Sequence, residues 1–232
     1  MKVSALTSLL LVLVTAGISQ TASADSDPVL QGSASYSLPQ SALDAEIDGS
    51  VTVAIRVDES GKPTKAVLFA GPMWPCGANP LSALEELSST LSEAMMQLRF
   101  SPAIKDGKPI TKNVGLKVAL KNPKLAPEFE IDPATGKRVA KQINGGVLNG
   151  KATVLPKPDY PAEARANLES GPVKIQILID EDGKVGRAGT VDGGTTLHYA
   201  AREAACAAKF TPTTLSGRPV RVSGVLTYNF IR

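Results

Sequence analysis

The most regular alternation of apolar and polar residues lies between positions 160 and 230 of the chain. Apolar residues occupy every second position from 173 to 179, and this period of two predicts a strand with one buried face. The turn residues 180–183 follow and predict a hairpin. Apolar residues then recur at helical spacing from 197 to 208, and a last alternating run fills 220–230. The pattern predicts a ββα unit closed by a third strand.

A second version of this pattern occurs earlier in the chain. Residues 49–62 match residues 171–184 at a constant separation of 122 positions, and residues 99–102 match 209–212 at a separation of 110. Such fixed separations indicate an internal repeat. The first copy differs by extra residues in the loop 71–80 and in a longer helix, whose apolar positions run from 84 to 98. Ser82 and Glu85 have the spacing of a capping box at the start of that helix.

The repeat divides the chain into five expected segments. Residues 1–24 have a positive start, an apolar run and an Ala-Ser-Ala end, which predicts a cleaved signal peptide. We expect a poorly ordered lead over 25–35, a first domain over 36–121, a linker over 122–150 and a second domain over 151–232. The mature protein is then expected outside the cytoplasm, most simply in a bacterial periplasm. An uncleaved membrane anchor is the alternative, although its apolar run is short of the about 20 residues that a span needs.

Composition favours a globular protein without a nucleic-acid partner. The chain has 232 residues, of which 43% are hydrophobic and 20% are charged. Its formal net charge is +3, from 25 Lys and Arg against 22 Asp and Glu. Nucleic-acid binding usually needs a clustered basic face, and the sequence has no such cluster.

Sequence motifs for catalysis, metals and cofactors are weak. Residues 145–152 approach a phosphate-binding loop but have Ala152 where a magnesium ligand is needed. The acidic turns at 58–61 and 180–183 are too short for a calcium loop. His198 is the one histidine, and neither cysteine has a C-x-x-C partner. We therefore expect no catalytic residues, no metal and no cofactor. A hydrolase with a carboxylate pair between the two copies stays open as an alternative from another class.

The two cysteines lie in different copies. At 100° per residue, Cys206 falls opposite the apolar stripe of its helix. An outward thiol in an oxidising compartment is usually paired, and Cys76 lies in the inserted loop of the other copy. We expect a Cys76–Cys206 disulfide that holds the copies together and adds about 4 to 5 kcal/mol in the chain-entropy model. Two free thiols, or a bridge to another chain, are the alternatives.

The second copy resembles the TonB C-terminal domain family. The shared features are, in order, Tyr160-Pro161, Gly171, the hairpin turn at 180–184, Phe210-Thr211-Pro212 and Gly217-Arg218-Pro219. The first copy resembles a degenerate member that lacks the tyrosine. The resemblance implies an α+β fold with two tandem small domains, each a three-stranded antiparallel sheet backed by a helix.

The resemblance also implies a function. Domains of this family lie in the periplasm and bind extended segments of outer-membrane receptors, without catalysis. Physically this is strand addition, in which a peptide pairs with the open edge of a sheet. The implied partner-binding residues precede the second copy and lie on its closing strand: Lys157, Pro158, Asp159, Tyr160, Val222, Leu226 and Tyr228.

The same resemblance sets limits on the expected role. An energy transducer needs an uncleaved anchor and a long proline-rich stretch, and we expect neither here. The expected partners are therefore peptide segments of outer-membrane receptors or other envelope proteins, bound without delivery of force. An anchored, transducer-like protein is the alternative function. A homodimer stays open, because domains of this kind can exchange strands.

Overall fold

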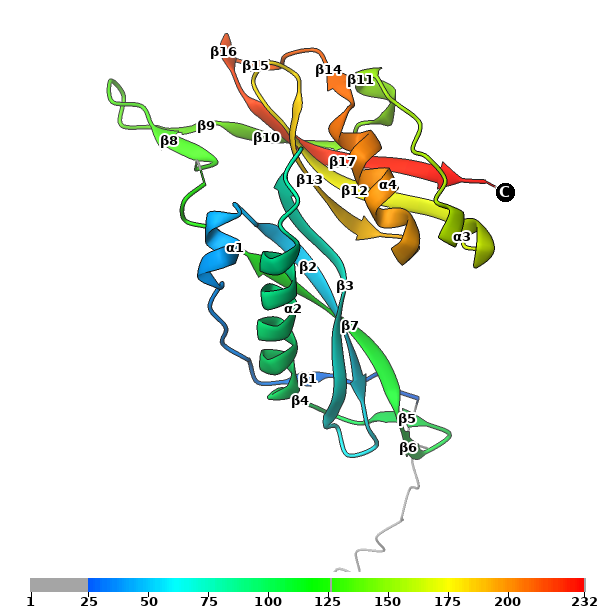
Figure 1. Ribbon diagram of the computed structural model, residues 1–232. Coiled ribbons are helices and arrows are strands. Elements are labelled where there is room, and N and C mark those ends of the chain that lie inside the picture. The colour runs from blue at the N-terminus through cyan, green and yellow to red at the C-terminus, as the bar shows by residue number, and fades with distance from the viewer. Residues whose placement is uncertain (1–24, 126, 232) are drawn as a thin grey trace, which may run out of the picture.

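The fold is built on one sheet with helices on one of its faces (Figure 1). It is described here from a computed structural model, which covers residues 25–125 and 127–231. Residues 1–24, on which the predicted signal peptide falls, lie outside the described part. The sheet has seven strands in the order β10-β17-β12-β13-β3-β2-β7. Their bounds are β2 (Gly49–Val57), β3 (Pro63–Pro75), β7 (Lys112–Leu120), β10 (Gln142–Val147), β12 (Gly171–Ile179), β13 (Val185–Asp192) and β17 (Arg221–Phe230).

Neighbouring strands of this sheet are antiparallel, except that β10 runs parallel to β17. The alternation seen in the sequence sets which side chains are buried. In β2 the odd positions 51–57 are buried, and in β12 the odd positions 173–179 are buried. Every second residue therefore points to the helices, as the period of two predicts.

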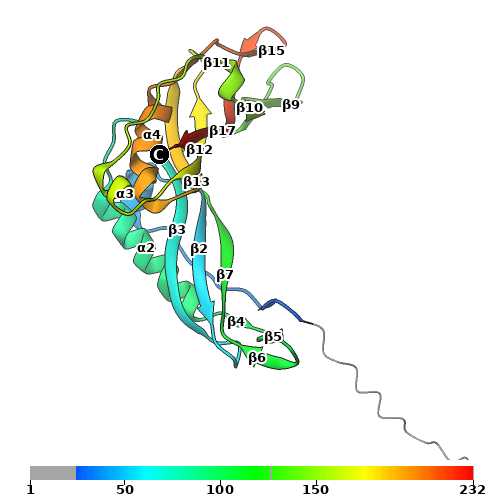
Figure 2. The same cartoon turned by 90° about the vertical axis from the view of Figure 1, so that its right-hand side faces the viewer.

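Both long helices cover the same face of the sheet (Figure 2). Helix α2 (Leu81–Met96) packs against β3, and α4 (His198–Cys206) packs against β13 and β12. The predicted capping box does not form, because α2 begins at Leu81 after Pro80 and so Ser82 already lies inside the first turn. The shorter helices are α1 (Gln40–Asp44), α3 (Ala162–Ala166), η1 (Asn149–Lys151) and η2 (Thr195–Leu197).

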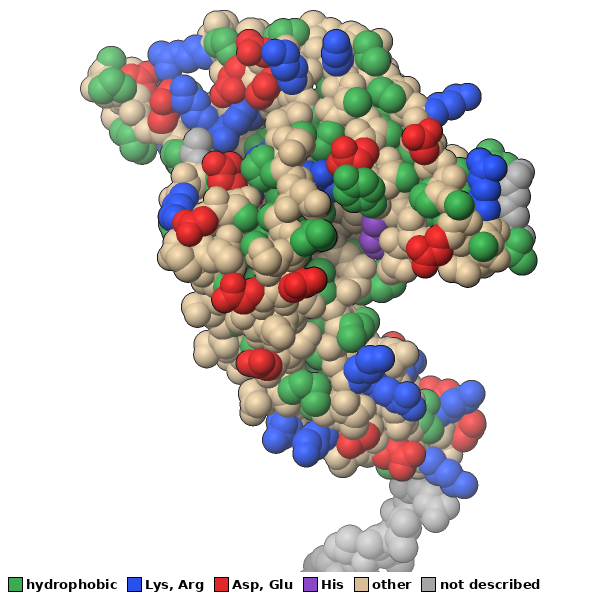
Figure 3. Space-filling view, viewed as in Figure 1, with side chains coloured by type: hydrophobic (Ala, Val, Ile, Leu, Met, Phe, Trp, Pro, Cys, Tyr) green, Lys and Arg blue, Asp and Glu red, His purple; other side chains and the backbone are tan. Residues whose placement is uncertain are grey.

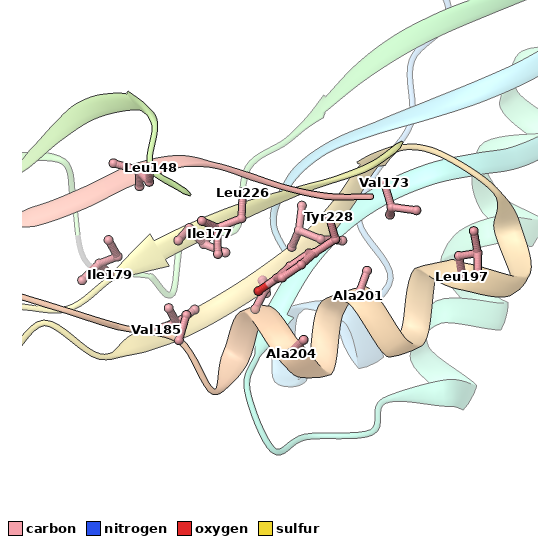
Figure 4. Packing of buried hydrophobic residues seen from close by; sticks show 14 of the residues in the cluster. Leu148, Val173, Ile177, Ile179, Val185, Leu197, Ala201, Ala204, Leu226 and Tyr228 are labelled. Atoms are coloured by element: carbon pink, nitrogen blue, oxygen red, sulfur yellow. The ribbon is translucent and has the colours of Figure 1, made fainter. Parts of the chain in front are cut away.

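The core consists of two hydrophobic clusters, one under each long helix. The first joins β2 and α2, with Ile55, Leu87 and Leu91 fully buried. The second lies between β12, β17 and α4 (Figure 4), where Leu226 and Tyr228 of β17 and Ala201 of α4 belong to one buried cluster. The fold is thus a mixed α+β fold, as expected.

The hairpin turns at Asp58 and Asp180 have the same internal geometry. The Asp58 side chain accepts hydrogen bonds from the backbone N–H groups of residues 60 and 62, and the Asp180 side chain from those of 182 and 184. Gly61 and Gly183 have φ of +82° in both cases. A Cβ at Gly61 would lie 2.0 Å from the carbonyl oxygen of Phe100, and one at Gly183 would lie 2.1 Å from that of Phe210. Only glycine fits these positions without displacement.

The two halves are continuous through β3 and β13, where the sequence suggests two separate sheets. Arg187 pairs with Pro75, Ala188 with Trp74 and Thr190 with Gly71. A Cβ at Gly189 would lie 2.1 Å from the carbonyl oxygen of Pro72, so glycine allows this close approach.

Separate two-stranded sheets occur besides the seven-stranded sheet, and some lie where the sequence suggests irregular structure. In the lead expected to be poorly ordered, β1 pairs with β4, and the expected linker contains β8, β9 and β10. Backbone groups in these segments pair with neighbouring strands, which stabilises them without a hydrophobic pattern of their own. The short pairs are β1 (Leu30–Gln31) with β4 (Arg99–Phe100), β5 (Ala103–Lys105) with β6 (Lys108–Ile110), β8 (Phe129–Ile131) with β9 (Arg138–Ala140), β11 (Ala152–Val154) with β14 (Lys209–Phe210) and β15 (Thr214–Leu215) with β16 (Arg218–Pro219).

Within the described part of the chain, no helix has the length and apolar character needed to cross a membrane.

Candidate functional site

Lys157, Pro158, Asp159 and Tyr160 lie in the segment that leads into α3. Lys157 and Asp159 are exposed, and neither takes part in an ion pair within residues 25–125 and 127–231. Pro158 and Tyr160 are half-buried. This segment therefore offers one positive and one negative side chain to a partner.

Tyr160 anchors this segment to the end of β17. Its ring packs edge-on against Phe230, with 5.4 Å between the ring centroids. Its hydroxyl donates a hydrogen bond of 2.6 Å to the carbonyl oxygen of Glu169, and the guanidinium of Arg165 lies 5.2 Å from its ring centroid. Tyr160 therefore holds residues 157–159 close to the C-terminal end of the strand.

The other predicted binding residues, Val222, Leu226 and Tyr228, have buried side chains in β17. Their side chains contribute to the core and are not available to a partner. Burial also raises the pKa of Tyr228 to about 12, and its hydroxyl has no hydrogen-bond partner among the described residues. Binding at β17 can therefore use the backbone of this strand, but not these three side chains.

In β17, the odd-numbered residues direct their backbone N–H and C=O groups outward, that is, away from β12. The N–H of Arg221 donates to Lys141, the carbonyl of Val225 accepts from Leu148, and Thr227 exchanges two hydrogen bonds with the side chain of Asn149. In an antiparallel pair, the backbone groups of successive residues point alternately toward and away from the neighbour. The even residues, including Val222 and Leu226, therefore pair with β12. Asn229 is exposed and belongs to the outward set.

Strand β10 covers the first half of this edge. It pairs in parallel with β17 from Arg221 to Val225. Leu148 follows β10 and is 2% exposed within the second core cluster. It lies over Gly224, where a Cβ would be 2.3 Å from its Cδ1 atom. The segment 142–149 is therefore anchored, and the part of the β17 edge beyond Thr227 is left without a paired strand in the described part of the chain.

A disulfide and a buried arginine join the two halves next to the β3–β13 pair. Cys76 and Cys206 form the expected disulfide, with 5.6 Å between their Cα atoms. Arg202 of α4 has a side chain that is 2% exposed and donates to the carbonyl oxygens of Trp74, Pro75 and Ala188. Its guanidinium also lies 4.0 Å from the Trp74 ring centroid. These contacts fix α4 of one half to β3 of the other.

On the opposite face, Arg187 of β13 joins the same two halves. Its Nη2 atom donates to Asp48 at 2.6 Å and to the carbonyl oxygen of Glu46. Burial raises the pKa of Asp48, and the charge of Arg187 opposes this effect. The ion pair borders a depression of about 840 Å³ on the helix-free face. Because Arg187 is already paired, the arrangement is a structural clamp.

Groups for metal or acid–base chemistry do not gather in the described residues. No group of three or more His, Cys, Asp or Glu side chains with metal-binding geometry occurs there. His198 contacts the carbonyl oxygen of Gly193 through Nε2 at 3.0 Å, and its burial lowers its pKa. This histidine has a structural contact at the start of α4.

The comparisons with known proteins concern the second half of the chain. Residues 156–231 match the model of the family described as Gram-negative bacterial TonB protein C-terminal. This segment is similar to TonB C-terminal domains. It contains β12, β13, α4 and β17, together with Lys157 to Tyr160. No curated protein matches the chain.

A solved structure also matches, the solution NMR structure of the TonB CTD of Pseudomonas aeruginosa. It is 24% identical, with a TM-score of 0.31, and the alignment covers 38% of this chain and 93% of that one.

Proposed function

We propose that the chain is a periplasmic, non-catalytic module that binds extended peptide segments of outer-membrane receptors or other envelope proteins by strand addition. The match of residues 156–231 to the TonB C-terminal family carries this proposal. The binding edge is β17, and the residues beside it are Lys157, Pro158 and Asp159, held by Tyr160.

The geometry of β17 supports a backbone-mediated mode. Its outward N–H and C=O groups already accept one parallel strand, β10, over Arg221–Val225. Asn229 continues the same row of outward groups beyond β10. A peptide that pairs there lies next to Lys157 and Asp159. These two residues can favour a peptide whose charges are complementary to theirs.

We also propose that residues 36–121 form a degenerate domain of the same type, joined to the domain at 151–232 by the segment 122–150. The constant sequence separation supports this. The matching turns at Asp58 and Asp180 support it as well, as do the equivalent close approaches of Gly61 to Phe100 and of Gly183 to Phe210.

The proposed soluble, periplasmic form has a direct test. N-terminal sequencing of the protein isolated from cells is expected to begin at Asp25. A chain that retains Met1 would instead favour the anchored, transducer-like form.

Photo-crosslinking tests the proposed edge. A photoreactive residue at position 229 is expected to capture segments of envelope proteins in intact cells, whereas the same residue at Glu59, in the distant β2–β3 turn, is not. Asn229→Pro removes an outward N–H and should abolish binding of the captured segment as a synthetic peptide, while Asn229→Ala should preserve it. Equal binding to both variants would exclude this edge.

A further inference from the structure

Strand β7 is the other end of the sheet, and its outer side is open. It pairs with β2 along its whole length, from Lys112 to Leu120. Within the described residues, no strand pairs with its second side. Figure 2 shows β7 along the outer border of the lower part of the sheet. Strand β17 has β10 as a second neighbour, whereas β7 has no second neighbour among the described strands.

The outward backbone groups of β7 can be assigned from a single contact. The hydroxyl of Tyr36 donates to the carbonyl oxygen of Ala119, so Ala119 points away from β2. Because the direction alternates, Asn113, Gly115 and Lys117 also present their N–H and C=O groups outward. All three residues are exposed. They provide an uninterrupted stretch for a short added strand.

The helix-free face next to this edge is apolar in the middle and basic at its flanks. Gly115, Ala54 and Val67 form one cross-strand row. Val67 is 43% exposed, and Phe69 further along the same strand is 42% exposed. Lys117 lies on the row beside Thr52.

The row on the other side carries Lys65, Arg56 and Asn113. Among the described residues, no ion pair involves Arg56, Lys65 or Lys117. By contrast, Asp and Glu side chains lie over the face that carries α2 (Figure 3). The open edge therefore adjoins the basic side of this half of the protein.

We propose that the β7 edge is a second strand-addition site, whose occupant is an extended segment of another protein with the alternating pattern acidic, any, aromatic, any, acidic. Residues on one face of an added strand recur at every second position. An aromatic residue opposite Gly115 can lie over this glycine, which has no side chain of its own, and reach toward Ala54 on the next strand. The flanking acidic residues then face Lys117 on one side and Asn113 with Arg56 behind it on the other.

A second copy of this chain fits the edge less well than an acidic segment. Antiparallel pairing of two β7 strands around Gly115 brings the basic residues of both copies onto one face. Lys117 of each copy then lies opposite Asn113 of the other, with Arg56 on the next strand, so like charges approach one another across the contact. The charge of the edge therefore favours an acidic partner over self-pairing.

The probe is the blocked peptide Glu-Thr-Phe-Thr-Glu, which presents the same pattern in both strand directions. Titrated into the isotopically labelled, oxidised full-length mature chain, it is expected to shift the NMR amide signals of Asn113, Gly115 and Lys117. Binding should weaken with added salt, because exposed charges are screened. A peptide with lysine in place of both glutamates is expected not to bind.

Gly115 allows a matched pair of variants. Gly115→Pro removes an outward N–H without removing a hydrogen bond to β2, and should weaken binding about tenfold or more. Gly115→Ala keeps that N–H, and its added Cβ meets only Thr52 Cγ2, at 3.5 Å. The alanine variant should therefore bind nearly as well as the wild type.

Charge reversal gives an independent test that does not depend on proline. The Lys117→Glu variant should no longer bind the acidic peptide and should bind the peptide that has lysine in place of both glutamates. Binding of the acidic peptide that is unchanged by both Gly115→Pro and Lys117→Glu would overturn the proposal. If Asn229→Pro abolishes peptide binding instead, the peptide binds at β17 and not at β7. If the chain dimerises through β7 in a concentration-dependent way and does not bind the peptide, the occupant of the edge is a second copy.

Discussion

Leu148→Ala should release β10 from the edge of β17 without unfolding the core. Leu148 is buried among the residues of the second cluster, and its side chain lies over Gly224. Truncation of a buried leucine to alanine costs about 2–5 kcal/mol. Leu148 lies at the border of the cluster, where neighbours can adjust, so the lower end applies. A loss of about 2 kcal/mol corresponds to a roughly 30-fold larger population of the state in which β10 is detached.

Hydrogen exchange of single amides measures this opening. The N–H groups of Arg221 and Thr227 are protected by Lys141 and Asn149, on the β10 side. Both amides should exchange about 30-fold faster in Leu148→Ala. The amides of the even-numbered residues of β17, which face β12, should keep their rates.

The exposed Leu155 supplies a control for the same chemical change, and Leu155→Ala should leave all these rates unchanged. The reasoning would be refuted if the amides of Arg221 and Thr227 exchanged at the wild-type rate in Leu148→Ala. It would also be refuted if the amides facing β12 accelerated equally, because β10 would then open only with the whole domain. If the reasoning holds, the same variant should bind β17 peptides more tightly.

Three further predictions concern stability. Reduction of Cys76–Cys206 should lower the free energy of unfolding by about 5 kcal/mol, given the 130-residue separation, as measured by urea titration with and without reductant. Gly183→Ala should lower the free energy of unfolding by more than about 2 kcal/mol, because the added Cβ would meet a backbone carbonyl. Gly217 also has a positive φ but has open space around it, so Gly217→Ala should cost about 1 kcal/mol or less. Thermal unfolding of the two variants compares these losses. The pKa of His198 is lowered by burial, so the folded state disfavours its protonation, and stability should fall as the pH drops below about 6.5. His198→Gln should remove that part of the pH dependence in urea titrations at pH 5 and pH 7.5.

The sequence predicts the parts of the fold that carry their own hydrophobic pattern. The strands β2, β12 and β17 and the helices α2 and α4 follow from alternation and helical spacing. The disulfide follows from the direction of Cys206 and the compartment. These features depend on local patterns and on simple rules of burial.

The unpredicted parts depend on long-range pairing. Residues 142–147 read Gln-Ile-Asn-Gly-Gly-Val, with little alternation, and form a strand because the edge of β17 lies beside them. The junction of β3 with β13 passes through Gly71 and Pro72, which are signals for a turn. At the proposed site, the sequence indicates Val222 and Leu226, but their side chains are buried, and in β17 the residues with buried side chains also direct their backbone groups to β12. Asn229 has the parity that the proposed strand addition requires.

The sheet also determines how far the protein can assemble through its edges. A stack of strands grows without limit only when each added unit leaves a new open edge at its far end. Here β3 and β13 cover each other's edges, and β10 covers most of the edge at one end of the sheet. The end strands of the seven-stranded sheet are β10 and β7, and β7 is the longer of the two. Two chains that meet at β7 therefore use up the longer end strand of both. A contact of β7 with β7 ends at a pair, whereas a contact of β7 with the β10 end of another chain would leave an open edge at each end.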